Sequence, residues 1–168
     1  GVVTRQPCPG AELTAAGRGV AVEVIRHHRL VELYLAEALG MPWDRVHQEA
    51  EVLEHAISPE LSELIAAKLG NPTHDPHGDP IPTADGEIEH ASSRPLDELE
   101  PGDGGIFVRI SDSDPEMLRW LSERGIAPGD RFEVLERQPF DGPLLLRFGS
   151  GDHALGGALV RMMRVETT

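Results

Sequence analysis

Apolar side chains recur at helical spacing through the first part of the chain. Successive residues of a helix turn by about 100°, and this spacing predicts helices over Leu13–Leu39, Trp43–Ile57 and Pro59–Leu69. The apolar stripe of the first helix consists of Val24, Ile25, Val31, Leu35 and Leu39, and that of the second of Val46, Ala50, Leu53 and Ile57. The short connection Gly40-Met41-Pro42 makes these two helices pack as an antiparallel hairpin.

Polar residues interrupt or flank both stripes. His28 and Glu32 lie within the stripe of the first helix at i, i+4 spacing, so both side chains point the same way. A carboxylate on an apolar face is costly unless it is paired or binds a metal. On the second helix, the flank beside the stripe carries His47, Glu51, Glu54 and His55. Imidazoles and carboxylates gathered on facing helices predict a metal site.

The second part of the chain changes to strand periodicity. Gly104–Ile110, Arg131–Glu136, Pro143–Phe148 and Ala158–Val165 read as short strands, with a helix at about Pro115–Arg124. Short strands with glycine-rich corners predict a small, partly open β-barrel. Residues 71–94 read as a structured loop followed by a linker. Their histidines His74, His77 and His90, near Asp75 and Asp79, could bind a metal, but loop histidines mostly have no such role. The fold class is therefore α+β.

Composition and charge limit the binding partners and the cellular compartment. A formal net charge of −14 argues against a large nucleic-acid footprint formed by these residues and is compatible with binding cations. Cys8 is the only cysteine, so a disulfide within the chain is excluded and a reducing compartment is expected. No apolar run is long enough for a membrane span, and no signal peptide is recognisable. We expect a cytoplasmic protein without a membrane partner.

Motifs of enzymes are not found in the sequence. There is no nucleophile triad pattern, no phosphate loop and no His-Glu-x-x-His motif, so no catalytic residues are assigned and no small organic ligand is expected. One alternative is a dinuclear carboxylate enzyme or a metal-storage protein, although such proteins normally use Glu-x-x-His pairs from two helices. Another is an accessory module of ferrous-ion transport, which would leave the helical histidines and carboxylates unexplained.

Three ordered motifs resemble one protein family. His28–Glu32, Val46–His55 and Pro76–Pro82 are similar to the metal-binding and dimerisation domain of the diphtheria-toxin-repressor family of iron- and manganese-responsive transcription factors. Pro95–Gly102, Gly125–Gly129 and Met162–Glu166 resemble the FeoA-type, SH3-like barrel that some members carry at the C-terminus. The resemblance implies a remnant of a winged DNA-binding domain at 1–17, a helical metal-binding and dimerisation domain at 18–82, a linker at 83–94 and the barrel at 95–168.

The resemblance also implies ligands and partners. Carried over by motif position, His28, Glu32 and His47 form one metal site, and Glu51, Glu54 and His55 a neighbouring one; Asp114 is a further candidate ligand, with Glu116 as a substitute. Iron-sensing members typically have Cys at the position of Glu51, and manganese-sensing members have Glu. The implied function is a Mn²⁺- (or Fe²⁺-) dependent regulator, with other divalent transition metals possible in vitro.

The implied assembly is a homodimer. Leu61, Ile65 and Leu69 are expected on its interface. Operator DNA would be read by an N-terminal helix-turn-helix that this sequence lacks, so these residues supply sensing and dimerisation.

Overall fold

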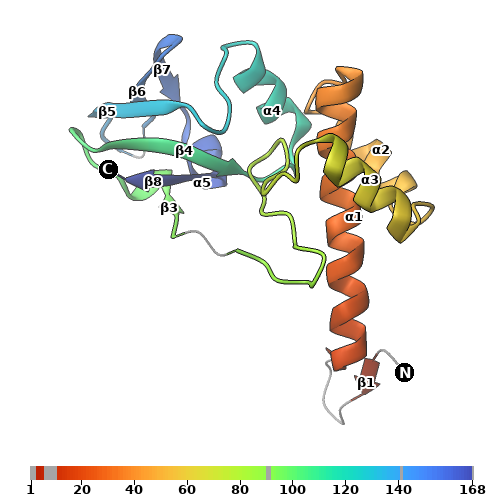
Figure 1. The fold of residues 1–168 in the computed structure, drawn as a ribbon. Coiled ribbons are helices and arrows are strands. Elements are labelled where there is room, and N and C mark those ends of the chain that lie inside the picture. The colour runs from red at the N-terminus through yellow and green to blue at the C-terminus, as the bar shows by residue number, and fades with distance from the viewer. Residues whose placement is uncertain (1–2, 6–10, 90–91, 141, 168) are drawn as a thin grey trace. The chain divides into compact units, whose positions relative to one another are not determined.

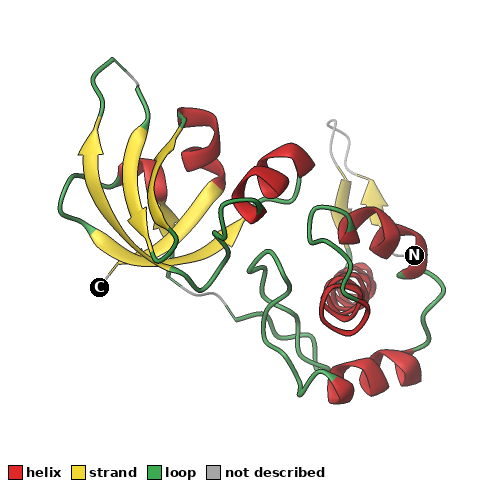
Figure 2. Cartoon of the chain, turned by 90° about the horizontal axis from the view of Figure 1, so that it is seen from above, coloured by secondary structure: helices red, strands yellow, loops and turns green. Residues whose placement is uncertain are grey.

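The computed structural model describes residues 3–5, 11–89, 92–140 and 142–167 (Figure 1). Its contacts divide the chain into two compact units, which are described separately. The helical unit comprises Gly1–Met41, Val46–Asp75 and Pro80–Glu89, and the sheet unit comprises Pro42–Arg45, Pro76–Asp79 and His90–Thr168. Figure 2 colours the helices red and the strands yellow; each unit contains both. In the described part of the chain, no helix is both long and apolar enough to cross a membrane.

Helix α1 (Ala15–Leu39) is the long axis of the helical unit. Thr14 caps its start, because its side-chain oxygen accepts a hydrogen bond from the backbone N–H of Gly17. Gly40 ends it in the left-handed conformation, at φ 67°. Before the helix, β1 (Val3–Arg5) and β2 (Ala11–Leu13) pair antiparallel. The predicted first helix is thereby confirmed, although its expected stripe residues Ile25 and Leu39 are exposed and the buried apolar positions are Leu30, Val31, Leu33 and Leu35.

Helix α2 (Val46–Leu53) is shorter than the predicted Trp43–Ile57. Residues 43–45 form a turn closed by a hydrogen bond from Arg45 N–H to the Pro42 carbonyl, and the Trp43 ring packs on the core of the sheet unit. At the other end the chain must become extended at Ser58, which precedes Pro59 and caps α3 (Pro59–Lys68). Glu54 and His55 therefore lie in the turn after α2 and not on the helix.

The sheet unit is built on six strands in the order β3-β8-β4-β5-β6-β7. These are β3 (Arg94–Pro95), β4 (Gly104–Ile110), β5 (Arg131–Arg137), β6 (Leu144–Phe148), β7 (Gly151–Leu155) and β8 (Met163–Thr167), with a 3₁₀ turn η1 (Leu96–Glu98) and helix α4 (Pro115–Ser122). The neighbours in this order pair antiparallel. Among the described strands β3 and β7 are the edges, so the pairing is that of an open sheet and does not show a closed barrel.

One strand prediction in the sheet unit was wrong, and one strand was missed. The expected strand Ala158–Val165 is helix α5 (Gly157–Met162) followed by β8. A short apolar run is ambiguous between strand and helix, and here Leu159 and Val160 both enter the core, which a helix permits when it lies on the sheet. Strand β7 was not predicted; it pairs with β6 across a tight turn.

Residues 80–89 make contacts within the helical unit. The Arg26 guanidinium donates to the Pro82 carbonyl at 2.7 Å, and Ile81 is buried among apolar residues of α1 and α3. Residues 83–87 form a turn in which the Thr83 hydroxyl accepts from the Glu87 N–H. By its contacts the helical unit includes residues 80–89, while the predicted domain boundaries stay a prediction. His90 lies outside the described residues.

Candidate metal centre

The site begins with two side chains on the same face of α1. Glu32 follows His28 by one turn, and its Oε1 lies 3.0 Å from His28 Nε2. The Glu32 side chain is 1% exposed and sits among the buried apolar residues of the helix. A carboxylate at that depth requires a partner of opposite charge or a cation.

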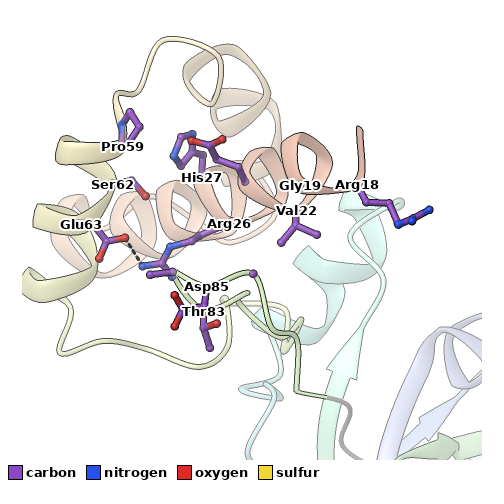
Figure 3. A pocket seen from close by; sticks show the side chains of 13 residues that line it. Arg18, Gly19, Val22, Arg26, His27, Pro59, Ser62, Glu63, Thr83 and Asp85 are labelled. Carbon is purple, nitrogen blue, oxygen red and sulfur yellow. Dashed lines mark hydrogen bonds and ion pairs between the residues drawn. The ribbon is translucent and has the colours of Figure 1, made fainter. Parts of the chain in front are cut away.

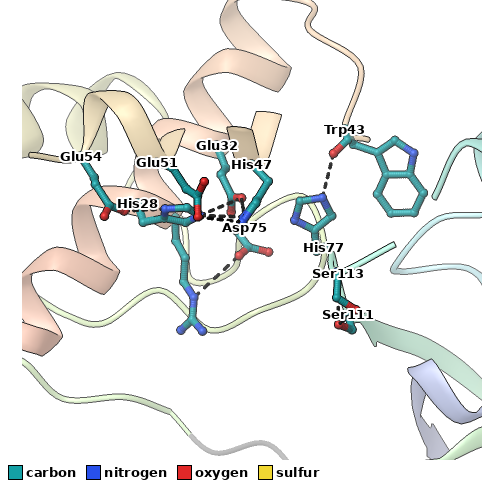
Figure 4. A network of polar contacts seen from close by, with 11 residues as sticks. His28, Glu32, Trp43, His47, Glu51, Glu54, Asp75, His77, Ser111 and Ser113 are labelled. Atoms are coloured by element: carbon teal, nitrogen blue, oxygen red, sulfur yellow. Dashed lines mark hydrogen bonds and ion pairs between the residues drawn. The ribbon is translucent and has the colours of Figure 1, made fainter. Parts of the chain in front are cut away.

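Helix α2 brings a second imidazole to this pair. Val46 and Ala50 are fully buried against α1, and this packing turns His47 toward it. His47 Nδ1 lies 3.2 Å from Glu32 Oε1 and 3.2 Å from His28 Nε2 (Figure 4). The three ligand atoms are thus close to one another. Because their lone pairs repel, a proton or a metal ion must lie between them.

These separations are compatible with ligation of one metal ion. With metal–ligand bonds of about 2.1 Å, adjacent ligands of an octahedron are about 3.0 Å apart, whereas those of a tetrahedron are about 3.4 Å apart. The observed separations of 3.0, 3.2 and 3.2 Å lie within this range, so the three atoms can share one ion. Octahedral sites rich in oxygen suit Mg²⁺, Ca²⁺ and Mn²⁺, and imidazole suits transition ions. A mixed nitrogen and oxygen set without thiolate therefore suits a divalent transition-metal ion.

Electrostatics in the metal-free site centre on His28. Burial lowers the pKa of its imidazole, but hydrogen bonds and charge interactions with Glu32 and Glu54 outweigh burial and raise the pKa to about 9. The hydrogen bond to Glu54 joins His28 Nδ1 to Oε2 at 2.6 Å. A proton on His28 thus takes the place of a cation between the two carboxylates.

The outer residues continue the same network. Glu51 Oε1 is 3.6 Å from His47 Nε2, and His55 Nε2 is 3.2 Å from Glu54 Oε1. Glu51 and His55 are 64% and 71% exposed, while Glu54 is 13% exposed. All the ligands predicted in the helical unit are therefore brought together. Among the described residues, however, Glu51, Glu54 and His55 do not all approach within 4.8 Å of one another, as His28, Glu32 and His47 do.

Asp114 lies in the sheet unit, where it has a structural role. Its Oδ1 accepts hydrogen bonds from the backbone N–H groups of Glu116 and Met117 and caps α4. Metal binding by Asp114 stays a prediction.

The predicted ligand set omitted one buried carboxylate, Asp75. Its side chain is 3% exposed and pairs with Arg29 at 3.8 Å. One of its oxygens lies within 4.8 Å of a carboxylate oxygen of Glu32. Its place in an irregular loop gave no periodicity that could indicate burial.

Both parts of the chain match known domains. Residues 14–83 match the iron dependent repressor, metal binding and dimerisation domain, and residues 94–167 match the FeoA domain. The iron-dependent repressor IdeR of Mycobacterium leprae is 32% identical over 168 residues, an alignment that covers 92% of this chain and 72% of the relative. The chain belongs to the diphtheria-toxin-repressor family.

Other relatives agree in sequence and in structure. The diphtheria toxin repressor of Corynebacterium glutamicum is 27% identical over 99% of this chain and 76% of its own length. A solved manganese-dependent transcriptional repressor in complex with manganese is 42% identical, covers 99% of this chain and 78% of its own, and superposes with a TM-score of 0.90. A second structure of a manganese-dependent transcriptional repressor is 45% identical, covers 93% of this chain and 86% of its own, and gives a TM-score of 0.84.

Family membership decides between the classes of function considered above. These relatives are metal-dependent transcriptional repressors, not enzymes, storage proteins or transport accessories. The helix-turn-helix region of the family is not among these 168 residues. The predicted family and α+β fold class, with helices first and a FeoA domain after them, are confirmed.

Proposed function

We propose that this chain is the metal-sensing and dimerisation part of a Mn²⁺-dependent DNA-binding repressor of metal homeostasis, with Fe²⁺ as the second candidate ion. The observation that carries the proposal is the trio His28, Glu32 and His47, whose ligand atoms are 3.0–3.2 Å apart and include a deeply buried carboxylate. Glu51, Glu54 and His55, which continue this network, are proposed as ligands of a neighbouring, more exposed site.

The donor set favours manganese. Glu51 offers a hard carboxylate where a thiolate would favour softer ions, and the described part of the network contains only oxygen and nitrogen donors. Two solved manganese-dependent transcriptional repressors, 42% and 45% identical, support manganese, although the solved manganese regulators SloR and ScaR are 26% and 27% identical, below the 32% of the iron-dependent repressor of Mycobacterium leprae. Related structures with Cd²⁺ and Zn²⁺ are those of ScaR, 28% and 30% identical. Other divalent ions are therefore expected to bind in vitro.

Sensing follows from the position of the ligands on two helices. His28 and Glu32 come from α1, and His47 comes from α2, so a bound ion joins the helices at fixed distances. The ion favours whichever arrangement of the helices holds the ligands at that spacing, by the difference in its affinity for the two states. We propose that this arrangement is the one competent for operator binding.

Dimerisation is proposed through an apolar groove of the helical unit. The groove has a volume of about 410 Å³ and is lined mainly by apolar side chains from α1, α2 and α3, among them Leu39, Leu53, Leu61 and Leu64. Leu39 and Leu64 are 63% and 62% exposed, and Leu61 is 45% exposed. Ile65, predicted on the interface, belongs mainly to the core, at 9% exposed. A stable symmetric dimer would cover such a patch on both copies.

The dimer is tested by Leu64→Glu. Sedimentation is expected to show a dimer for the unaltered protein and a monomer for this variant. Val20→Glu is the matched control, because Val20 is also exposed, at 53%, and does not line the groove. A Leu64→Glu protein that stays dimeric would exclude this groove as the interface.

Function as a repressor is tested on DNA. In a form of the protein that includes the family's helix-turn-helix, Mn²⁺ is expected to increase affinity for a two-fold operator, and Glu32→Gln is expected to abolish the increase. Operator binding that does not change when Mn²⁺ is removed would contradict the proposal. Consumption of oxygen or mineralisation of iron by the protein would instead favour the enzyme or storage alternative. A single cysteine and a role on DNA favour the cytoplasm as the location.

A further inference from the structure

A second polar cavity lies in the helical unit, and none of the proposed metal ligands lines it. It has a volume of about 620 Å³ and is bounded by the first turns of α1, the start of α3 and the turn 83–86 (Figure 3). Sites for small molecules typically measure about 300–1,000 Å³, whereas one water molecule occupies about 30 Å³. The cavity is thus large enough for an organic ligand.

The deep side of the cavity carries polar groups without partners. Ser62 is 2% exposed, and its hydroxyl makes no hydrogen bond within the described structure; the same is true of the buried Nε of Arg26. His27 is 7% exposed, and no described residue hydrogen-bonds to its ring. Buried polar groups are nearly always hydrogen-bonded in native proteins, and each one left unpaired is destabilising. The two buried unpaired groups, with the His27 ring beside them, point to a ligand that accepts hydrogen bonds.

The Arg26 guanidinium is held in place before any ligand binds. It donates to the Pro82 carbonyl at 2.7 Å and to Glu63 at 2.8 Å, and its side chain is 13% exposed. A fixed guanidinium next to a hydroxyl and an imidazole is well suited to a carboxylate, because charge-assisted hydrogen bonds to a prearranged donor lose little conformational entropy. A metal ion is disfavoured by the same cation, and none of the groups of ligand atoms that come within 4.8 Å among the described residues includes a residue of this cavity.

The mouth of the cavity carries acidic side chains, whereas its deep side carries hydrogen-bond donors. Glu23, Glu63 and Asp85 line it and are exposed, while the donors are buried. A simple anion would be repelled at this rim, whereas a molecule with a carboxylate at one end and an ammonium group near it matches both ends. We propose that this cavity binds a small zwitterionic carboxylate of the amino-acid class. The site is independent of the metal centre proposed above. It departs from the expectation that no small organic ligand binds. The sequence did not indicate the site, because its walls come from three separate segments and form no local motif.

Three matched compounds test the proposal on the metal-free protein. L-leucine carries both groups, 4-methylpentanoate lacks the ammonium group, and L-leucinamide lacks the carboxylate. In titrations followed by ¹H–¹⁵N NMR, L-leucine is expected to shift amide resonances of residues 18–27, 59–63 and 83–86, 4-methylpentanoate to do so more weakly, and L-leucinamide not to do so. Saturation by L-leucinamide as readily as by L-leucine, or no titration by any of the three at millimolar concentration, would overturn the proposal.

A pair of serine variants connects binding with the cavity. Ser62→Ala is expected to weaken L-leucine binding about tenfold, because it removes one donor without enlarging the side chain. Ser122→Ala, at an exposed helical position of the sheet unit, is the control and is expected to change nothing. His27→Gln provides a second test with the same expected loss should Ser62→Ala fail to fold. Equal affinity in Ser62→Ala, His27→Gln and the control would refute the assignment of the site.

Discussion

Binding of Mn²⁺ to the helical unit should release a proton from His28. The pKa of His28 is about 9 in the metal-free protein, so at pH 7 the imidazole is protonated in a ratio of about 100 to 1. Metal ligation requires the neutral ring. Removing the proton at pH 7 costs about 3 kcal/mol, which is two pH units at about 1.4 kcal/mol each. The apparent affinity for Mn²⁺ should therefore rise about tenfold from pH 7 to pH 8.

Calorimetric titration in buffers with different ionisation enthalpies measures this proton directly. At pH 7 about one proton per ion is expected from His28. Glu54→Gln removes the charge that lies 2.6 Å from His28 Nδ1, so it should reduce the proton release and flatten the pH dependence. Glu60→Gln, at an exposed position of α3, should leave both unchanged. Affinity that is the same at pH 7 and pH 8, with no buffer-dependent heat, would refute the reasoning.

The same pKa shift links the stability of the metal-free protein to pH. Because the pKa of His28 is raised on folding, from 6.5 to about 9, the stabilisation is fully present below pH 6.5 and is lost as pH rises through 9. Its full size is about 3 kcal/mol. Thermal unfolding of metal-free protein should therefore occur at a lower temperature at pH 9 than at pH 6.5, and the difference should shrink in Glu54→Gln.

Three further substitutions test other parts of the account. Gly78→Ala should destabilise the sheet unit by about 3 kcal/mol or more in urea unfolding, because φ of Gly78 is +86° and an added Cβ would overlap the backbone oxygen of Val108. The control is Gly70→Ala: φ of Gly70 is +78°, but no atom lies within 4 Å of the added Cβ, so the free energy of unfolding should fall by about 1 kcal/mol. Phe107→Ala should cost about 4 kcal/mol, since Phe107 is fully buried, and Phe140→Ala, at a fully exposed position, less than about 0.5 kcal/mol. Glu51→Cys should raise the ratio of Zn²⁺ to Mn²⁺ affinity at least about tenfold in competition titrations.

Each of these predictions has an outcome that would contradict it. Equal losses in Gly78→Ala and Gly70→Ala would mean that the close backbone approach at Gly78 relaxes without cost. Equal losses of unfolding free energy in Phe107→Ala and Phe140→Ala would mean that Phe107 does not belong to the core. An unchanged metal preference in Glu51→Cys would show that this side chain does not reach the ion.

The helices could be predicted from the sequence because their information is local. Apolar spacing, the Thr14 and Ser58 caps and the glycine at position 40 all lie within or beside the elements they define. The i, i+4 spacing of His28 and Glu32 is likewise enough to place both on one face of a helix. The start of α2 was predicted too early because Trp43 packs against the core of the sheet unit, whose residues are distant in sequence.

The remaining features depend on contacts between distant residues. The run at 158–162 forms a helix because both Leu159 and Val160 find apolar partners on the sheet, which spacing alone does not reveal. Asp75 is buried beside Arg29 by a loop without periodicity. The cavity around Ser62 exists only once α1, α3 and the turn 83–86 are assembled, so no single stretch of sequence predicts it.

The most direct test of the central claim is Mn²⁺ titration of Glu32→Gln beside the unaltered protein. Glu32 is the most buried member of the trio and lies within 3.2 Å of both imidazoles, and glutamine keeps its shape while removing its charge. Glu37→Gln, on an exposed position of the same helix, is the control. The account predicts that Glu32→Gln weakens binding at least about tenfold, or about 1.4 kcal/mol, while the control binds normally. Equal Mn²⁺ affinity in all three proteins would mean that the trio is a structural network and not a metal site.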